Sequence, residues 1–240
     1  MTGYRTKDGP LKLSRSKIDL FLECPRCFWM DVKKGIKRPR GPGFSLNSAV
    51  DHLLKKEFDL LRNEKKAHQL MKKYNVEAIP FAHEKLNQWR NNFSGIQYYH
   101  PEIELLIYGA IDDLWINNKK ELHIVDYKST STSEKLSLDG EYKEGYKKQV
   151  EVYQWLFRKN GFLVSDTAYF VYANASKNRE KFDGRLEFDL TILSYKGNSS
   201  WVEETIFKIK EILDRDKVPE VNVNCEFCLY NKKILNFLKY

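Results

Sequence analysis

The spacing of hydrophobic residues changes along the chain, from a helical period to a strand-like one. Residues 14–30 carry apolar side chains at helical spacing, and Ser14 or Ser16 can cap the predicted helix. A second helix is predicted from about Asn47 to Arg62, and weaker helical character continues to about Asn92. Its inward-facing stripe is predicted to be Val50, Leu53, Leu54, Phe58 and Leu61. The first part of the chain is therefore predicted to be helical.

Beyond this region, apolar and polar residues alternate with the two-residue period of strands. The predicted strands are 97–108, 110–116, 121–128, 164–175 and 181–192. The first three are expected to be antiparallel, with a turn at Asn117 and Asn118, and Gly184 favours a bulge in the last strand. The predicted helices in this part are 145–160 and 201–215, and a polar loop covers 129–141.

This order of elements predicts an α/β (α+β) fold with a central mixed sheet flanked by helices. We expect a single domain over residues 1–240. Its predicted parts are a helical N-terminal part (14–92), a catalytic core (93–215) and a cysteine-bearing tail (216–240) that packs back on the first helix.

Composition supports a folded chain with an anionic partner. Hydrophobic residues make up 42% of the 240 residues, enough for a substantial core. The formal net charge of +8 favours a polyanion, with nucleic acid first and an anionic membrane surface second. There is no apolar run of the roughly 20 residues that a membrane span needs, and residues 1–13 lack the apolar core of a signal peptide. We therefore expect a cytoplasmic location and no membrane partner.

Two aspartates and a lysine form the most informative group. Asp126 and Lys128 lie two residues apart in a predicted strand and therefore project from the same face. Asp112 follows the preceding strand, although Asp113 could equally supply that carboxylate. Two carboxylates can hold Mg2+ or Mn2+, with the main-chain carbonyl of Tyr127 as a further ligand, and the lysine can stabilise charge developing on phosphorus. The alternative for these residues is an ordinary strand with an exposed ion pair.

Three further residues are candidates for supporting roles. Gln149 and Tyr153 are spaced i and i+4 on a predicted helix and so share a face. Gln149 can orient a lysine or a water molecule, and Tyr153 can donate to a phosphate, although Tyr153 also fits the hydrophobic stripe of its helix. His52, next to Asp51, can complete a metal site or contact phosphate, or can be a structural histidine.

The four cysteines form two C-x-x-C pairs, Cys24 with Cys27 and Cys225 with Cys228. In a reducing compartment this pattern favours metal binding over disulfides, with free thiol pairs as the alternative. The pairs lie about 200 residues apart, so a shared metal would link the first helix to the tail. Four thiolates suit Zn2+ and also suit an iron–sulfur cluster.

Together these motifs resemble the RecB-like branch of the PD-(D/E)XK nuclease superfamily. That branch includes the RecB and AddB nuclease domains and the CRISPR-associated RecB-like exonucleases. The resemblance rests on the order of five motifs: residues 13–28, His52, Gly109-Ala110-Ile111-Asp112, Asp126-Tyr127-Lys128 and Gln149-x-x-x-Tyr153. The chain departs from the family pattern at Ile111, where the nominal residue is proline, and near His52, where the usual glycine is missing.

The resemblance implies a restriction-endonuclease-like core and a metal-dependent deoxyribonuclease. It implies Asp112 and Asp126 as metal ligands, Lys128 as catalytic, His52 as an extra ligand, and Gln149 and Tyr153 in support. It also implies activity on single-stranded DNA or DNA ends, with possible protein partners in a repair, replication or CRISPR complex. The alternative functions are an inactive nuclease-like DNA-binding subunit and a zinc-clamped interaction protein.

Many RecB-like nucleases carry a [4Fe-4S] cluster held by one N-terminal and three C-terminal cysteines, whereas this chain has two and two. We expect the cluster, with Zn2+ as the alternative. Basic residues between 33 and 40 (Lys33, Lys34, Lys37, Arg38 and Arg40) can bind DNA phosphates, and the neighbouring Phe28 and Trp29 can stack on bases. Lys143, Lys147 and Lys148 can guide the DNA backbone to the metal.

Overall fold

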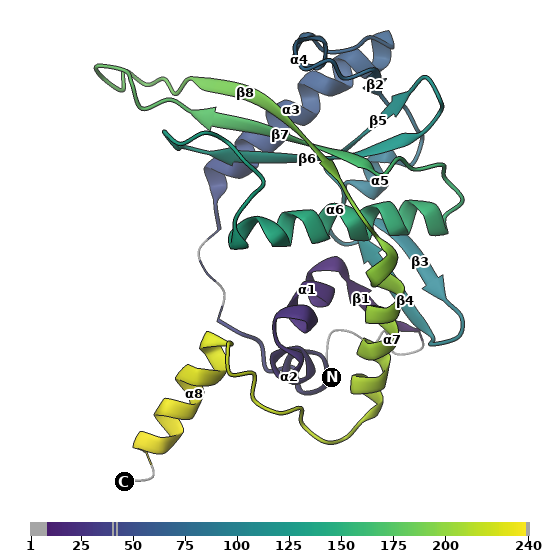
Figure 1. The fold of residues 1–240 in the computed structure, drawn as a ribbon, viewed down its shortest axis with the longest axis vertical. Helices are drawn as coiled ribbons and strands as arrows, with labels where there is room; N and C mark the ends of the chain where they lie inside the picture. Colours follow the sequence, from purple (N-terminus) through teal and green to yellow (C-terminus); the bar gives the residue numbers. More distant parts are fainter. Residues whose placement is uncertain (1–8, 40, 42, 239–240) are drawn as a thin grey trace. The chain divides into compact units, whose positions relative to one another are not determined.

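A computed structural model describes residues 9–39, 41 and 43–238 (Figure 1). The helices are α1 (Arg15–Glu23), α2 (Pro25–Lys34), α3 (Ser45–Glu64), α4 (Gln69–Lys73), α5 (Leu86–Trp89), α6 (Glu141–Lys159), α7 (Ser200–Asp214) and α8 (Glu226–Phe237). The strands are β1 (Leu11–Ser14), β2 (Ala78–Pro80), β3 (Ile96–His100), β4 (Leu105–Gly109), β5 (Asp113–Asn117), β6 (Leu122–Thr130), β7 (Thr167–Ala175) and β8 (Phe188–Lys196). Arg40, one of the predicted phosphate-binding residues, lies outside the described residues.

The chain divides into two compact units, each assembled from separate parts of the sequence. Unit 1 comprises Met1–Pro42, Gln97–Tyr108 and Ser200–Tyr240. Unit 2 comprises Gly43–Ile96 and Gly109–Ser199. The single nuclease domain that we expect from the sequence stays a prediction.

Unit 2 is built on a five-stranded sheet with the order β2-β5-β6-β7-β8. The β6–β7 pair is parallel and the other pairs are antiparallel, so the sheet is mixed. This architecture confirms the predicted α/β class. Figure 1 shows α3 and α6 on opposite faces of this sheet.

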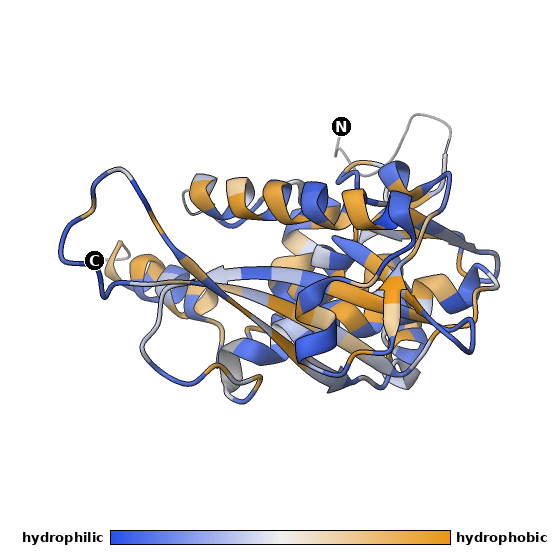
Figure 2. Cartoon of the chain, turned by 90° about the horizontal axis from the view of Figure 1, so that it is seen from above, coloured by the Kyte–Doolittle hydropathy of each residue, from blue (hydrophilic) through white to orange (hydrophobic). Residues whose placement is uncertain are grey.

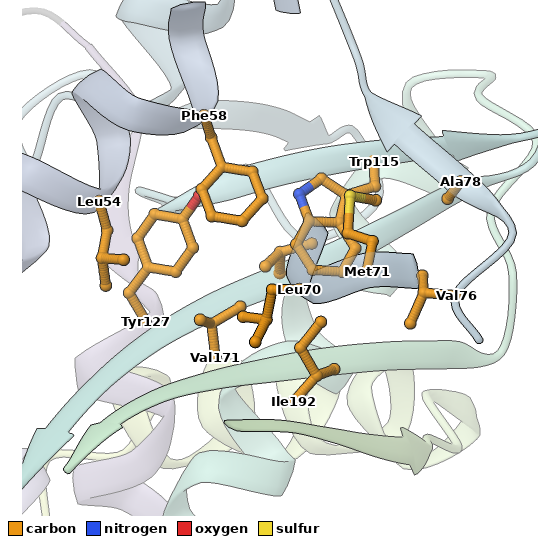
Figure 3. Packing of buried hydrophobic residues seen from close by; sticks show 11 residues of the cluster. Leu54, Phe58, Leu70, Met71, Val76, Ala78, Trp115, Tyr127, Val171 and Ile192 are labelled. Carbon is orange, nitrogen blue, oxygen red and sulfur yellow. The ribbon is translucent and has the colours of Figure 1, made fainter. Parts of the chain in front are cut away.

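The core of unit 2 lies on the face that α3 covers. Its buried cluster joins Leu54 and Phe58 of α3 to Trp115, Tyr127 and further sheet and α4 residues (Figure 3). Because side chains alternate along a strand, the neighbours of Tyr127 in β6, Asp126 and Lys128, project from the opposite face. That is the face on which α6 packs, and the ring of Tyr146 in α6 lies 4.5 Å from the Lys128 Nζ.

Unit 1 contains α1, α2, α7 and α8 and a small sheet with the order β1-β4-β3, in which β1 and β4 are parallel. The helices α1 and α2 pack on each other and on α7. Ile18, Phe28 and Ile209 are fully buried in this unit. The hydropathy colouring of Figure 2 shows hydrophobic and hydrophilic residues interleaved along the helices, as expected for helices with one buried face.

Several element boundaries differ from the prediction, for local reasons. The helix predicted over 14–30 is broken at Cys24, which is extended (φ −159°, ψ 101°) because it precedes Pro25. The strand predicted over 97–108 is two strands, β3 and β4, separated by a turn in which Glu104 has a φ of 52°. Gly184, with a φ of 68°, lies in the β7–β8 connection rather than in a strand bulge.

Other differences come from tertiary contacts. Strand β2 lies in a region with weak helical character and pairs with β5. The tail after α7 contains a further helix, α8, that the pattern did not predict. Leu53, placed on the inward stripe of α3, is 62% exposed, whereas Phe58 is fully buried.

Candidate functional site

The candidate carboxylates Asp112 and Asp126 stand opposite each other at one end of the β5–β6 pair. Asp113 pairs with Val125 in this antiparallel ladder, so the preceding residue, Asp112, faces Asp126. The main-chain N–H of Tyr127 donates to Asp112 Oδ2 over 3.0 Å. Lys128 forms an ion pair with Asp126, whose side chain is 1% exposed. The structure therefore brings together the predicted Asp112, Asp126 and Lys128.

The chain just before β5 is held firmly, which fixes the position of Asp112. Gly95 approaches Gly109 so closely that an added Cβ would lie 2.3 Å from the Gly109 oxygen. Arg90 Nε donates to the main-chain oxygen of Asp112 over 2.9 Å. A side chain at position 95 would therefore displace the backbone that leads to Asp112.

Helix α3 adds two residues that the sequence did not single out as functional. Lys55 Nζ lies 2.8 Å from Asp51 Oδ2 and 3.1 Å from Asp112 Oδ1, so one ammonium group bridges two carboxylates. Burial, together with the neighbouring charge of Asp112, raises the pKa of Asp51. Burial alone would lower the pKa of Lys55, but the charges of Asp112 and Asp51 outweigh it and the pKa is raised. Asp51 thus belongs to the same electrostatic group as Asp112.

Asp113 has a different role from Asp112. Its side chain is fully buried and accepts from Arg62 Nη2 (2.5 Å), Arg90 Nη2 (2.9 Å) and the Tyr127 hydroxyl (2.7 Å). Both arginines also pair with Asp59 of α3. Because its oxygens already have these partners, Asp113 is a structural residue, and Asp112 is the carboxylate that remains at the candidate site.

A cavity of about 440 Å³ lies beside these groups. Its lining includes Asp51, Asp112, Lys128, Tyr146 and Gln149. Two other predicted site residues lie elsewhere. His52 is exposed on α3, and Tyr153 is 3% exposed within α6, and neither is among the residues that line the cavity. Their predicted roles stay predictions.

Tyr172 of β7 is another residue that the sequence analysis missed. It pairs in register with Lys128 and is 1% exposed. Its hydroxyl has no hydrogen-bond partner among the described residues. Burial, with the nearby Tyr146 and Asp126, raises the pKa of Tyr172 to about 12, so the hydroxyl keeps its proton at neutral pH. The Tyr172 hydroxyl is therefore a buried proton donor beside the candidate Lys128.

The donor type at this site is the one that a hard divalent cation prefers. Asp112 and Asp126 carry carboxylate oxygens, and Asp51 is linked to Asp112 through Lys55. Lys55 between Asp51 and Asp112 shows that this position attracts positive charge. The signal that could have identified Asp51 is its spacing, because it lies three residues before Leu54 and seven before Phe58, on the buried face of α3.

The four cysteines come together within unit 1, and all are free thiols. Their Sγ atoms all lie within 4.8 Å of one another, which is a metal-binding arrangement. Cys24 and Cys225 are the N-cap residues of α2 and α8, and each second cysteine lies in the first turn of that helix. Burial raises the pKa of Cys27. Burial would also raise the pKa of Cys225, but hydrogen bonds from the Cys228 amide and the neighbouring thiols lower it.

The predicted nucleic-acid contacts near α2 need correction. Phe28 and Trp29 are 0% and 1% exposed, so neither ring can stack on a base. Lys33 bonds to the Arg215 oxygen over 2.8 Å, which links α2 to the chain after α7. By contrast, Lys143 lies 5.4 Å from the ring of Tyr146, which lines the cavity, and it remains a candidate for phosphate contact.

Among the described residues, no helix is long and apolar enough to cross a membrane.

Comparisons with known proteins identify the family of this chain. The sequence model of the PD-(D/E)XK nuclease superfamily matches residues 12–232. No curated protein matches the chain. A solved structure titled "Crystal structure of SSO0001" covers 95% of this chain and 86% of its own, at 13% identity and a TM-score of 0.38. That likeness is too low to support an argument, so the assignment rests on the family match.

Proposed function

Because the chain belongs to the PD-(D/E)XK nuclease superfamily, we propose that it is a metal-dependent deoxyribonuclease whose active site lies in unit 2. The observation that carries the proposal is the register of β5 and β6. It sets Asp112 opposite Asp126, with Lys128 on the same sheet face as Asp126. Asp112 and Lys128 line a cavity of about 440 Å³.

In this proposal Asp112, Asp126 and the main-chain carbonyl of Tyr127 hold Mg2+ or Mn2+. Asp51 of α3 is a further carboxylate ligand, and Lys55 balances the charge of Asp51 and Asp112 in the absence of the ion. When bound, the ion supplies Lewis acidity toward the phosphate oxygens. The family match supports a divalent metal in general, and the donor set supports a hard one.

The protein groups around the metal position the substrate and stabilise charge. The Lys128 ammonium, held by Asp126 and backed by the Tyr146 ring, stabilises negative charge that develops on the transferred phosphate. Gln149 lines the same cavity and orients the attacking water or Lys128. The Tyr172 hydroxyl donates to a phosphate oxygen or to the water. The resemblance implies His52 as an extra ligand and Tyr153 in support. Because Asp51 lines the cavity and His52 does not, we propose Asp51 in place of His52 as the ligand from α3.

We propose single-stranded DNA or DNA ends as the substrate, by resemblance to RecB-like exonucleases. The net charge of +8 supports a polyanionic substrate. Lys143, Lys147 and Lys148 on α6 lie near the cavity-lining Tyr146 and Gln149 in sequence, and guide the DNA backbone. Partner proteins of a repair, replication or CRISPR complex and a cytoplasmic location are part of the same proposal.

The test is cleavage of end-labelled single- and double-stranded DNA with Mg2+, with Mn2+ or with EDTA. We expect metal-dependent products from the wild type, and a fall in rate of roughly 10³-fold or more in Asp126→Asn. Product lengths separate exonuclease from endonuclease action. The control variant is Asp189→Asn, since Asp189 is an exposed aspartate of β8.

Thermal unfolding of each variant shows whether the fold survives. No products from folded wild-type chain, with DNA binding retained, would favour the inactive DNA-binding subunit. Products that persist in folded Asp126→Asn would overturn the assignment of the active site.

A further inference from the structure

Four cysteines can bind a single Zn2+ or a [4Fe-4S] cluster, and the sulfur–sulfur distances in this site distinguish between the two. Cys24 Sγ and Cys228 Sγ are 3.6 Å apart, and Cys27 Sγ lies 3.7 Å from both Cys225 Sγ and Cys228 Sγ. A Zn–S bond of about 2.3 Å in a tetrahedral site places the sulfurs about 3.8 Å apart. The observed distances therefore match four ligands around one ion.

A [4Fe-4S] cluster requires a wider site. Each cysteine then binds its own iron at a separate corner of the cube, so the four sulfurs are spread around the whole cluster. Here all four Sγ atoms lie within 4.8 Å of one another. We propose that Cys24, Cys27, Cys225 and Cys228 bind a single tetrahedral Zn2+, in place of the cluster that the family resemblance predicts.

The surroundings of the sulfurs support a tetrathiolate zinc site. Both C-x-x-C pairs have the same local structure, in which the first cysteine caps a helix. The positive ends of α2 and α8 therefore face the thiolates, which favours the ionised form that binds metal. The Cys27 N–H donates to Cys24 Sγ over 3.4 Å and so orients this sulfur.

Arg38 supplies a counter-charge to the site. Its Nη2 donates to Cys225 Sγ over 3.1 Å, and its Nη1 pairs with Glu23 over 2.6 Å. The Arg38 guanidinium also lies 4.5 Å from the centre of the Phe227 ring. In the sequence, Phe227 lies between Cys225 and Cys228. Four thiolates around one Zn2+ carry a net charge of about −2, so a cation bonded directly to a sulfur stabilises the complex.

The zinc also explains how α8 is held to unit 1. Cys228 is the one buried residue of α8, and every other residue of this helix except the half-buried Phe227 is exposed. Apolar burial alone is too small to fix a helix of this length. The metal bonds of Cys225 and Cys228 thus provide most of the attachment, since metal binding couples directly to folding.

The metal content of the cysteine site is measured independently of any nuclease activity. The full chain is produced in medium that contains both iron and zinc and is purified without oxygen. We expect one zinc per chain by elemental analysis, and a colourless protein. Iron with inorganic sulfide and visible absorption would overturn the proposal, as would a folded chain that binds neither metal.

The attachment of α8 is measured by amide hydrogen exchange. A zinc chelator is expected to expose the α8 amides to exchange and leave those of α3 in unit 2 protected, and added zinc is expected to restore protection. The same exchange in Cys228→Ser, without chelator, is expected to match the chelated wild type. Unchanged α8 protection after complete zinc removal would contradict the role of the metal in holding this helix.

Arg38 is tested by its effect on zinc affinity. Competition with a chromophoric chelator is expected to show roughly 10-fold weaker zinc binding in Arg38→Ala. Lys217→Ala is the matched control, because the Lys217 side chain is 86% exposed in the same unit. Equal zinc affinities in the two variants would show that Arg38 does not stabilise the zinc site. The identity of the metal is tested separately by the metal content of the chain.

Discussion

Two neighbouring groups of aspartates in unit 2 both draw on α3 and on the start of β5, but they differ in the cations that balance their charge. The open group takes Asp51 from α3, Asp112 from the residue before β5 and Asp126 from β6, and lysines balance its charge. The closed group takes Asp59 from α3 and Asp113 from β5, and Arg62 and Arg90 balance its charge.

The difference lies in the cations. Arginine presents a planar fork that binds carboxylates through several hydrogen bonds at once, so the closed group is rigid. Lysine is a point charge on a flexible side chain, and a divalent ion can take over its role. Asp113 at the start of β5 thus belongs to a fixed support, and Asp112, one residue earlier, belongs to a site that can accept a metal.

The largest expected effect comes from breaking the closed group. Asp113→Asn leaves Arg62 and Arg90 without a buried counter-charge, and we expect a loss of about 3–5 kcal/mol in the free energy of unfolding. Urea denaturation measures it. Asp112→Asn, at the neighbouring position, is expected to abolish cleavage and to change stability by less than about 1 kcal/mol. A comparable loss of stability in both variants would contradict the division into two groups.

The next effect separates the two neighbouring candidates on α3. Asp51 lines the cavity and His52 is exposed, so Asp51→Asn is expected to lower cleavage by about 10²-fold and His52→Asn by less than threefold. The Mn2+ affinity, measured by electron paramagnetic resonance, is expected to fall in Asp51→Asn alone. If His52→Asn instead weakened Mn2+ binding, His52 would be the ligand, as the resemblance implies.

A smaller effect contrasts two buried tyrosines. The Tyr127 hydroxyl belongs to the closed group, so Tyr127→Phe is expected to cost about 1–2 kcal/mol of stability. The Tyr172 hydroxyl has no partner among the described residues, so Tyr172→Phe is expected to leave stability unchanged or higher. We expect Tyr172→Phe to lower kcat about 10-fold with little change in DNA binding. An unchanged kcat would make Tyr172 a packing residue.

The smallest effect is a difference in pH dependence between the two aspartates of α3. Burial would raise the pKa of Asp59, but Arg90 and Arg62 lower it, whereas burial and Asp112 raise the pKa of Asp51. A lowered carboxyl pKa gives stability that is present above the unfolded value and is lost as pH falls through the folded value. A raised pKa gives the opposite slope, because its stabilisation is lost as pH rises through the folded value.

Urea denaturation of the metal-free chain between about pH 3 and pH 7 measures both slopes. The destabilisation caused by Asp59→Asn is expected to shrink toward acid pH. The free energy of unfolding of Asp51→Asn is expected to increase relative to that of the wild type as pH rises above about 4. Parallel pH profiles for the two variants would contradict the electrostatic difference between the open and closed groups.

The local features of this protein follow from its sequence patterns. The two-residue period of β6 put Asp126 and Lys128 on one face, and the ion pair between them follows from that spacing. The helical period located α3, α6 and α7, and the alternation of helices and strands gave the α/β class. Two C-x-x-C pairs indicated a metal site. These features depend on neighbours within a few residues, which a sequence pattern records directly.

The tertiary structure shows which of two adjacent residues lies at a site, and it sets the distances between groups that come from distant parts of the chain. Asp113 rather than Asp112 is the structural carboxylate because two arginines from distant positions reach it. Asp51 rather than His52 lines the cavity because of how α3 lies against the sheet. The sulfur spacing that favours one zinc ion requires Cys24 and Cys228, 204 positions apart, to meet. Each outcome depends on contacts between segments far apart in the chain, which local periodicity does not encode.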